Sequence, residues 1–287
     1  MDDANDEAAL RLSRCDAAEL LKEGLEFAKR GRQDDAVGVY ESLIEGFAAS
    51  TDILTREQVA WAFQNRAVAL AELGRINDAV SASDDLIVTY SSDTDTRLLR
   101  RLAHGLLLKS RLLRDSGDTT GAISAYSDLI RRFHTTDESE LRVLVSDALV
   151  NRGDLLDISG RSDDALASYE ELARLFGDDS NATTRQNVAS GMANKIGVLQ
   201  RLGRAADALD VSDALITRYG DESPDELREY VRHALLYRAV ALEALGRRRE
   251  AYKAYGDLLR NDGVDAKDNE AASYARARLN ALQAGNN

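Results

Sequence analysis

The sequence predicts an all-α protein: an α-solenoid, or superhelix, of six helix-turn-helix units followed by a C-terminal capping helix. Glycines recur at a constant interval of 43 residues, at Gly31, Gly74, Gly117, Gly160, Gly203 and Gly246. Alanine stands five positions after each of these glycines, and leucine stands twelve positions after each. Apolar residues on both sides of each glycine follow the spacing of an amphipathic helix. Each unit is therefore expected to be a helical hairpin.

A fixed period with uniform apolar columns indicates units that bury their apolar faces only by stacking on one another. We place the six units at residues 11–53, 54–96, 97–139, 140–182, 183–225 and 226–268. Residues 1–10 are expected to form an acidic N-terminal tail, residues 269–283 a capping helix and residues 284–287 a short tail.

Within each unit we expect helix A, of about 20 residues, to run up to the glycine and helix B, of about 15 residues, to follow it. Three sites match a capping box at the start of helix A: Thr55 with Gln58, Thr183 with Gln186, and Ser223 with Glu226. Three glycines are expected to end helix B in the left-handed conformation: Gly177, Gly220 and Gly263.

The composition disfavours several classes of partner. A net charge of −13 provides no basic field for nucleic acid or for an acidic membrane surface. The first residues lack a secretory signal, and no run approaches the roughly 20 apolar residues that span a bilayer. Cys15 is the single cysteine, so no disulfide framework is expected. We therefore expect a cytoplasmic protein.

The residues around the glycines are similar to the tetratricopeptide repeat. The resemblance rests on Leu73-Gly74-Arg75 followed by Asp78-Ala79-Val80, and it covers residues 11–268. Small residues occupy the place of that family's helix A glycine: Gly24, Ala67, Ser110, Gly153 and Ala239. The period of 43 exceeds the family's usual 34, and the extra residues are expected mostly at the start of helix A.

The resemblance implies that helix A lines a concave groove where a partner binds. Positions 2, 6, 9, 13 and 16 before each glycine lie opposite the apolar side of helix A. The candidate partner-binding residues on this face are Trp61, Asn65, Arg101, His104, Arg111, Asn151, Asn194, Arg201, Tyr230, His233 and Tyr237.

These candidates have alternative interpretations. The three asparagines share one column, and their amides could hold an extended peptide or bond the neighbouring helix. The arginines and His104 are candidates for an anionic group or a C-terminal carboxylate. The aromatic residues suit either interface anchors or ordinary packing.

A basic column lies one position after the asparagine column: Arg66, Lys109, Arg152, Lys195 and Arg238. Its angle, about 40° from the centre of the apolar side, places it closer to the interior than to the groove. We therefore predict that it pairs with acids of helix B rather than with a ligand: Asp85, Asp128, Glu171 and Asp257.

No pattern indicates catalysis, a cofactor or a metal. The sequence has neither a nucleophile elbow nor a phosphate loop, and His104 and His233 are expected three units apart. The predicted function is a non-enzymatic scaffold or adaptor that binds a peptide or protein. The alternatives are a sensor subunit that responds to a small ligand or signal peptide, and a purely architectural subunit. Polar ends predict a monomer or a small discrete oligomer.

Overall fold

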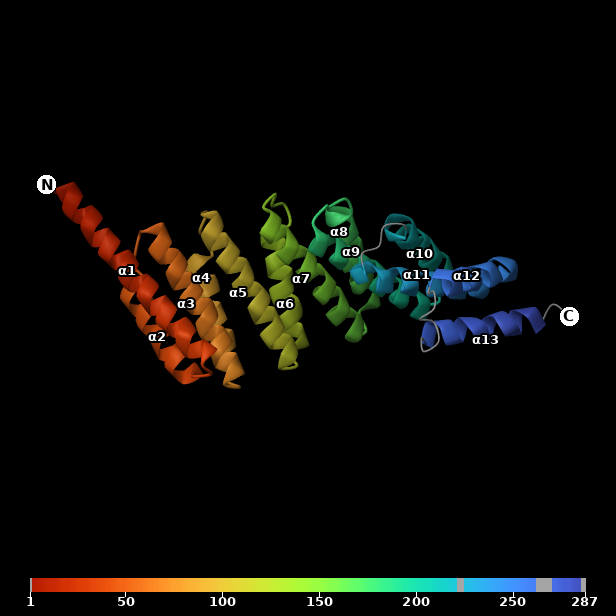
Figure 1. Ribbon diagram of the computed structural model, residues 1–287, viewed down its shortest axis with the longest axis horizontal. Helices are drawn as coiled ribbons and strands as arrows, with labels where there is room; N and C mark the ends of the chain where they lie inside the picture. The colour runs from red at the N-terminus through yellow and green to blue at the C-terminus, as the bar shows by residue number, and fades with distance from the viewer. Residues whose placement is uncertain (1, 221–224, 262–269, 285–287) are drawn as a thin grey trace. The chain divides into compact units, whose positions relative to one another are not determined.

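The computed structural model describes residues 2–220, 225–261 and 270–284, which form an all-α repeat fold of thirteen helices with no strand. The helices, coloured from red to blue along the chain in Figure 1, are α1 (Asp2–Lys29), α2 (Gln33–Phe47), α3 (Ile53–Glu72), α4 (Ile76–Tyr90), α5 (Thr96–Asp115), α6 (Thr119–Phe133), α7 (Ser139–Ile158), α8 (Ser162–Phe176), α9 (Ala182–Arg201), α10 (Ala205–Tyr219), α11 (Asp225–Ala244), α12 (Arg248–Asn261) and α13 (Glu270–Ala284).

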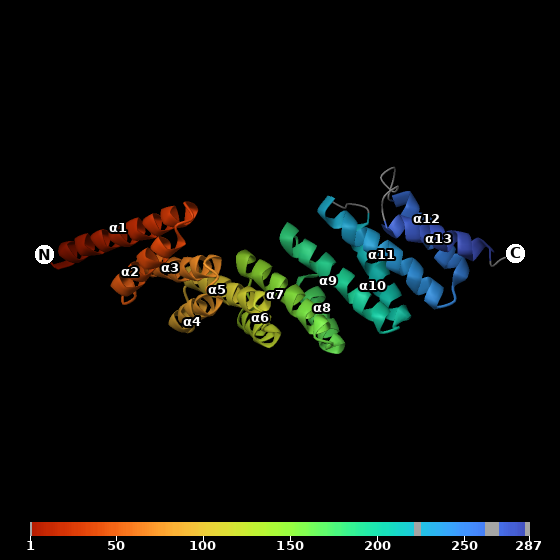
Figure 2. The same cartoon turned by 90° about the horizontal axis from the view of Figure 1, so that it is seen from below.

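The chain divides into two compact units, residues 1–148 and 149–287, whose boundary lies within α7. In the first unit, the hairpins α1/α2, α3/α4 and α5/α6 stack so that α3 contacts both α1 and α5 (Figure 2). In the second unit, α9/α10 and α11/α12 stack in the same way, and α13 packs on α12 and α11. No helix of the described ranges combines the length and apolar character needed to cross a membrane.

The turn between helix A and helix B depends on glycine. Gly74 has a φ of +74°, a left-handed conformation that costs side-chain-bearing residues energy. This turn lets Arg75 N–H donate to the Leu70 carbonyl at 2.9 Å, as in a Schellman motif. The φ values of the six repeat glycines span +71° to +87°, so one local geometry recurs at every 43-residue step.

Three expectations about helix ends are wrong. The side chains that cap α3 and α9 are Asp52 and Asn181, which lie three and two residues before the predicted Thr55 and Thr183. The reason is that a carboxylate and an amide accept backbone N–H bonds better than a hydroxyl does. The Ser223 site lies outside the described residues.

Gly177 and Gly220 are right-handed, with φ of −52° and −67°, and Gly263 lies outside the described residues. A Cβ at Gly177 would lie 2.5 Å from the Ala173 carbonyl oxygen, so space rather than handedness explains this glycine. Finally, α1 begins at Asp2, which makes most of the expected tail 1–10 helical. Alanine, leucine and glutamate propagate a helix, and nothing in that segment interrupts it.

The core is built from small residues opposite large ones. Seven positions before the repeat glycine, Gly153 faces Tyr169 of its own hairpin, and a Cβ on Gly153 would lie 2.5 Å from the tyrosine ring. In the hairpin α9/α10, the same two positions hold Ile196 and Ser212. In one hairpin helix B supplies the large side chain and in the other helix A does, so the volume that fills the contact is similar in both.

A second column of small residues lies between successive hairpins, and it was not predicted from the sequence. A Cβ on Gly191 of α9 would lie 2.5 Å from Leu172 of α8, a member of the uniform leucine column, and Gly105 of α5 meets Leu86 of α4 in the same way. Helix A of these hairpins therefore has a small residue against the preceding helix B.

We predict that Gly153→Ala lowers the free energy of unfolding by about 1–3 kcal/mol because the new methyl group meets the buried Tyr169 ring. The matched control is Gly197→Ala, also within a helix A, where the nearest atom is 3.7 Å away. This control should raise stability by about 0.5–1 kcal/mol, the usual gain from replacing a helical glycine. Urea unfolding measures both, and equal effects of the two changes would contradict the packing described.

A second prediction concerns Asp52, whose buried carboxylate accepts hydrogen bonds from Arg14 Nε at 2.9 Å and Thr55 N–H at 3.0 Å. The bond from Arg14 holds the pKa of Asp52 well below its usual range. A depressed pKa means that the stabilisation is complete above about pH 4 and is lost as the pH falls through the folded-state pKa.

Asp52→Asn retains a capping side chain and removes the charge, so it should cost roughly 1–3 kcal/mol at pH 7. The difference between wild type and variant should shrink when urea unfolding is repeated near pH 3. A difference that is independent of pH would show that the ion pair contributes nothing.

Candidate functional site

The basic column forms an ion-pair seam, a name we use for Arg66, Lys109, Arg152, Lys195 and Arg238 with their carboxylate partners on helix B. The prediction that this column pairs with helix B is confirmed. Arg66 contacts Asp85 at 3.4 Å and Arg152 contacts Glu171 at 2.8 Å, both as expected within their own hairpins.

The other three cations pair with the preceding helix B, through Lys109–Asp84, Lys195–Glu170 and Arg238–Asp213. The expected acids Asp128 and Asp257 are wrong as partners, because they accept from Arg131 and Arg260 one turn later. Arg66 also contacts Glu41 of the preceding helix B at 3.8 Å, so a seam cation can pair with its own helix B or with the preceding one.

The predicted binding residues lie on what we call the A-helix face, the half-exposed side of the A helices that carries positions 2, 6, 9, 13 and 16 before the glycine. Three of its nitrogen-bearing side chains already contact carboxylates of a neighbouring A helix. His104 Nε2 lies 2.8 Å from Glu140 Oε1, and Arg111 donates to Asp147 at 2.9 Å. Arg201 is paired with Asp157.

A spacing signal for two of these pairs was available in the sequence. His104–Glu140 and Arg111–Asp147 both join residues 36 apart, which is one repeat less two helical turns. Helices α5 and α7 therefore contact with a two-turn offset at these pairs, and aligning the two helices with that offset would have indicated Glu140, which was not predicted from the sequence.

The asparagines are largely engaged within the protein. Asn65 Nδ2 donates to the Trp61 carbonyl at 2.8 Å, one turn back on α3. Asn194 Nδ2 donates at 2.7 Å to Asp154, which also accepts from the Tyr169 hydroxyl at 2.6 Å. Burial raises the pKa of Asp154, and these two donors stabilise its charged form. Asn151, in the same column, is half-buried on α7 and has an interaction of its own.

The aromatic candidates of the second unit lie together on α11. The rings of His233 and Tyr237 are 4.4 Å apart at an angle of 49°. Tyr230 and Tyr237 are partly buried against the apolar cluster that joins α9, α10 and α11. Burial lowers the pKa of His233, which favours the neutral ring at neutral pH. These side chains are therefore packed and still half-exposed on the A-helix face.

Trp61 of α3 and Arg101 of α5 form the closest contact between a predicted aromatic and a predicted cation. The Arg101 Cζ lies 4.0 Å from the centroid of the Trp61 ring. Arg101 is only 9% exposed, and its Nε is fully covered without a hydrogen-bond acceptor. Burial lowers the pKa of Arg101. Trp61 is half-buried, and it is the only tryptophan of the chain.

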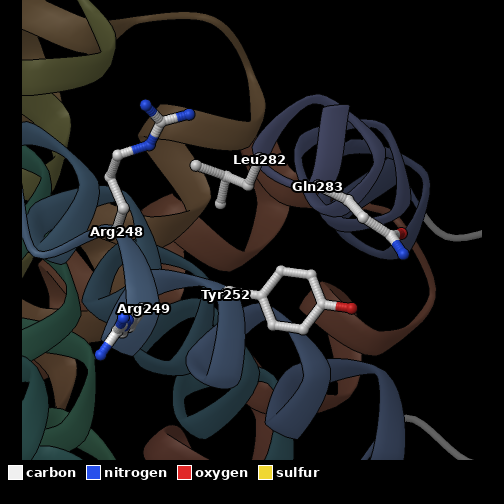
Figure 3. A pocket seen from close by; sticks show the side chains of 5 residues that line it. All are labelled: Arg248, Arg249, Tyr252, Leu282 and Gln283. Carbon is white, nitrogen blue, oxygen red and sulfur yellow. The ribbon is translucent and has the colours of Figure 1, made fainter. Parts of the chain in front are cut away.

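A separate hollow of about 190 Å³ lies between the start of α12 and the end of α13. Figure 3 shows the side chains that line it, which are Arg248, Arg249, Tyr252, Leu282 and Gln283. None of the predicted binding residues belongs to this hollow. Within the described ranges, no three His, Cys, Asp or Glu side chains gather in a way that could hold a metal ion.

The comparison with known families bears on the sixth hairpin. A family model described as tetratricopeptide repeat matches residues 233–262, which include most of α11, the turn at Gly246 and α12. The sixth hairpin therefore matches a tetratricopeptide repeat. The match falls on one hairpin, and the same glycine turn recurs in the others.

Two solved structures share the fold of this chain. BtubC (BKLC) from P. vanneervenii has a TM-score of 0.56 and 13% identity, over 91% of this chain and 94% of that one. The signal transduction ATPase with numerous domains from Pyrococcus horikoshii, which carries a tetratricopeptide repeat sensor, has a TM-score of 0.59 and 13% identity, over 95% of this chain and 40% of that one. No curated protein sequence matches this chain. Identities this low establish the fold alone.

The ion-pair seam yields a stability prediction. Arg152 is 17% exposed and donates to both Glu171 and the Ser168 hydroxyl, so Arg152→Met should cost about 1–2 kcal/mol by leaving both acceptors without their donor. Arg131→Met removes an exposed pair with Asp128 and should cost less than about 0.5 kcal/mol. Chemical denaturation compares the two, and equal losses would mean that burial does not strengthen the seam.

Proposed function

We propose that this chain is a non-enzymatic interaction module that holds a segment of a partner protein on its A-helix face. The proposal rests on one observation about this face. Its aromatic and polar side chains are half-exposed, and bonds within the protein hold many of them in place. Side chains held in one geometry lose little conformational entropy when a partner binds.

The face combines the residue types that dominate protein interfaces. Trp61 and Arg101 lie on it in the first unit, and Tyr230 and Tyr237 lie on it in the second. Tryptophan, tyrosine and arginine are the commonest interface hot spots. Exposed apolar residues also occupy positions of this face, since Val68 is 37% exposed on α3 and Ile158 is 80% exposed at the end of α7. These features support a protein segment as the ligand.

The alternative, a sensor for a small ligand, has less support. Pockets for such ligands enclose about 300–1,000 Å³, whereas the hollow between α12 and α13 measures about 190 Å³ and is lined mostly by exposed side chains. A thermal-shift screen of metabolites would favour the sensor if one compound raised the melting temperature in proportion to its concentration.

Selection of binding sequences from a displayed peptide library, followed by charge insertion, tests the proposal. Val68→Glu and Ser190→Glu place a charge on the A-helix face of the first and the second unit. Val88→Glu is the matched control, because Val88 is 73% exposed on α4, a helix B of the same hairpin as Val68.

Each selected peptide should lose about tenfold or more in affinity with one of the two A-helix variants, since burying an unpaired charge costs more than about 1.4 kcal/mol. Binding to the Val88→Glu control should stay at the wild-type level. Unfolding midpoints close to wild type show that all three variants fold. Peptides that bind all three variants equally would place the binding surface elsewhere.

A further inference from the structure

The surface shared by α12 and α13 differs in charge from the rest of the chain. The whole chain has a net charge of −13, and α2, the first helix B, carries four acidic residues and no basic one. In contrast, α12 carries four basic residues and two acidic ones. The residues that line the hollow between these helices, together with the adjacent lysine, form what we call the α12/α13 patch: Arg248, Arg249, Tyr252, Lys253, Leu282 and Gln283.

Three cations of this patch are unpaired. Arg248, Arg249 and Lys253 are exposed, and none of them has a hydrogen bond or an ion pair within the described ranges. In contrast, the exposed arginines that follow the repeat glycines each contact an acid three residues later, as Arg75 contacts Asp78 at 2.8 Å. Positive charges that are concentrated and unpaired raise the local potential, which attracts an acidic ligand.

The two acids of α12 are held by other side chains. Glu250 accepts from Arg247 Nε at 2.8 Å and from Arg247 Nη2 at 2.7 Å. Asp257 pairs with Arg260, one turn later on the same helix. Neither carboxylate therefore neutralises the cations of the patch, and the acidic groups that complement them must come from another molecule.

The hollow gives the patch an apolar centre. Figure 3 shows Arg248 and Tyr252 projecting from α12 beside Leu282 and Gln283 of α13. Leu282 is 5% exposed and Tyr252 is 44% exposed, so an apolar group that enters the hollow gains contact with both. Its volume of about 190 Å³ is smaller than the roughly 300–1,000 Å³ of ligand pockets, which suits one side chain better than a whole small ligand.

We propose that the α12/α13 patch is a second interaction surface, which binds an acidic segment of a partner protein that inserts one large apolar side chain into the hollow. An apolar anchor in a pocket, surrounded by arginine and tyrosine, is typical of the centre of a protein interface. The net charge of −13 repels a long polyanion such as nucleic acid, whereas a short acidic segment needs only the cations of the patch. None of the predicted residues of the A-helix face lies in this patch.

Nuclear magnetic resonance of the isotope-labelled full chain shows where a probe binds. Acetyl-Asp-Glu-Phe-Glu-Asp-amide carries acids on both sides of an apolar anchor and reads the same in both chain directions. Acetyl-Asn-Gln-Phe-Gln-Asn-amide lacks the charge, acetyl-Asp-Glu-Ala-Glu-Asp-amide lacks the anchor, and a short single-stranded oligodeoxythymidine represents nucleic acid. At millimolar concentrations the first peptide should shift the amide signals of α12 and of the end of α13 to saturation. The other three probes should bind about tenfold or more weakly.

A double variant tests the cations. Arg248→Gln combined with Arg249→Asp gives α12 the two residues with which α2 begins, Gln33 and Asp34, so the variant is expected to fold. It should weaken the acidic phenylalanine peptide about tenfold or more, because one cation is lost and the other is reversed.

Two further variants separate charge from shape. Lys29→Gln combined with Arg30→Asp makes the same change of charge at two adjacent exposed cations of the first unit, and it should bind the peptide like the wild type. Tyr252→Ala removes one wall of the hollow, so the phenylalanine and alanine peptides should bind to it with similar affinity. Unfolding midpoints show whether each variant folds.

Several results would overturn the inference: no saturable shift with the acidic phenylalanine peptide, shifts centred on other helices, equal binding of the neutral or the alanine peptide, or wild-type binding by the folded double variant. Oligodeoxythymidine that bound as tightly as the acidic peptide would assign the patch to nucleic acid instead. The proposed function is tested independently, because its charge insertions at Val68 and Ser190 lie on the A-helix face.

Discussion

The close packing of helix A against the B helices beside it is the constraint on which the other features of this protein depend. Small residues on helix A allow this packing against its own helix B, as in Gly153 against Tyr169, and against the preceding helix B, as in Gly191 against Leu172. Packed interiors transmit size changes as small as a methylene.

That spacing determines how the charges are used. Each seam cation pairs with an acid of its own helix B or of the preceding one, as Lys109 pairs with Asp84 while Asp128 pairs with Arg131. On the opposite side, the two-turn offset of α5 and α7 joins His104 to Glu140 and Arg111 to Asp147. The acidic chain therefore neutralises nearly all the conspicuous cations of these columns internally.

As a consequence, bonds within the protein hold many side chains of the A-helix face in place, and few of its polar groups remain available to a partner. Residues that resembled free binding groups, such as Asn194 and Arg201, hold neighbouring helices in place instead. What they leave for a partner is a preorganised surface of half-exposed aromatic rings with one buried guanidinium that lacks an acceptor. Such a surface suits recognition of another chain, since preorganisation lowers the entropic cost of binding.

The sequence by itself determined the helical hairpins, the glycine turns at a 43-residue interval and the pairing of the basic column with helix B, because each depends on local backbone geometry or on one repeated column. Only the tertiary structure decided that Asp52 rather than Thr55 caps α3, that Asn194 bonds Asp154, and that Arg101 rather than Arg111 lacks a carboxylate. These outcomes depend on the offset between neighbouring helices. Side-chain volumes at non-local contacts set that offset, and no periodic pattern in the sequence records it.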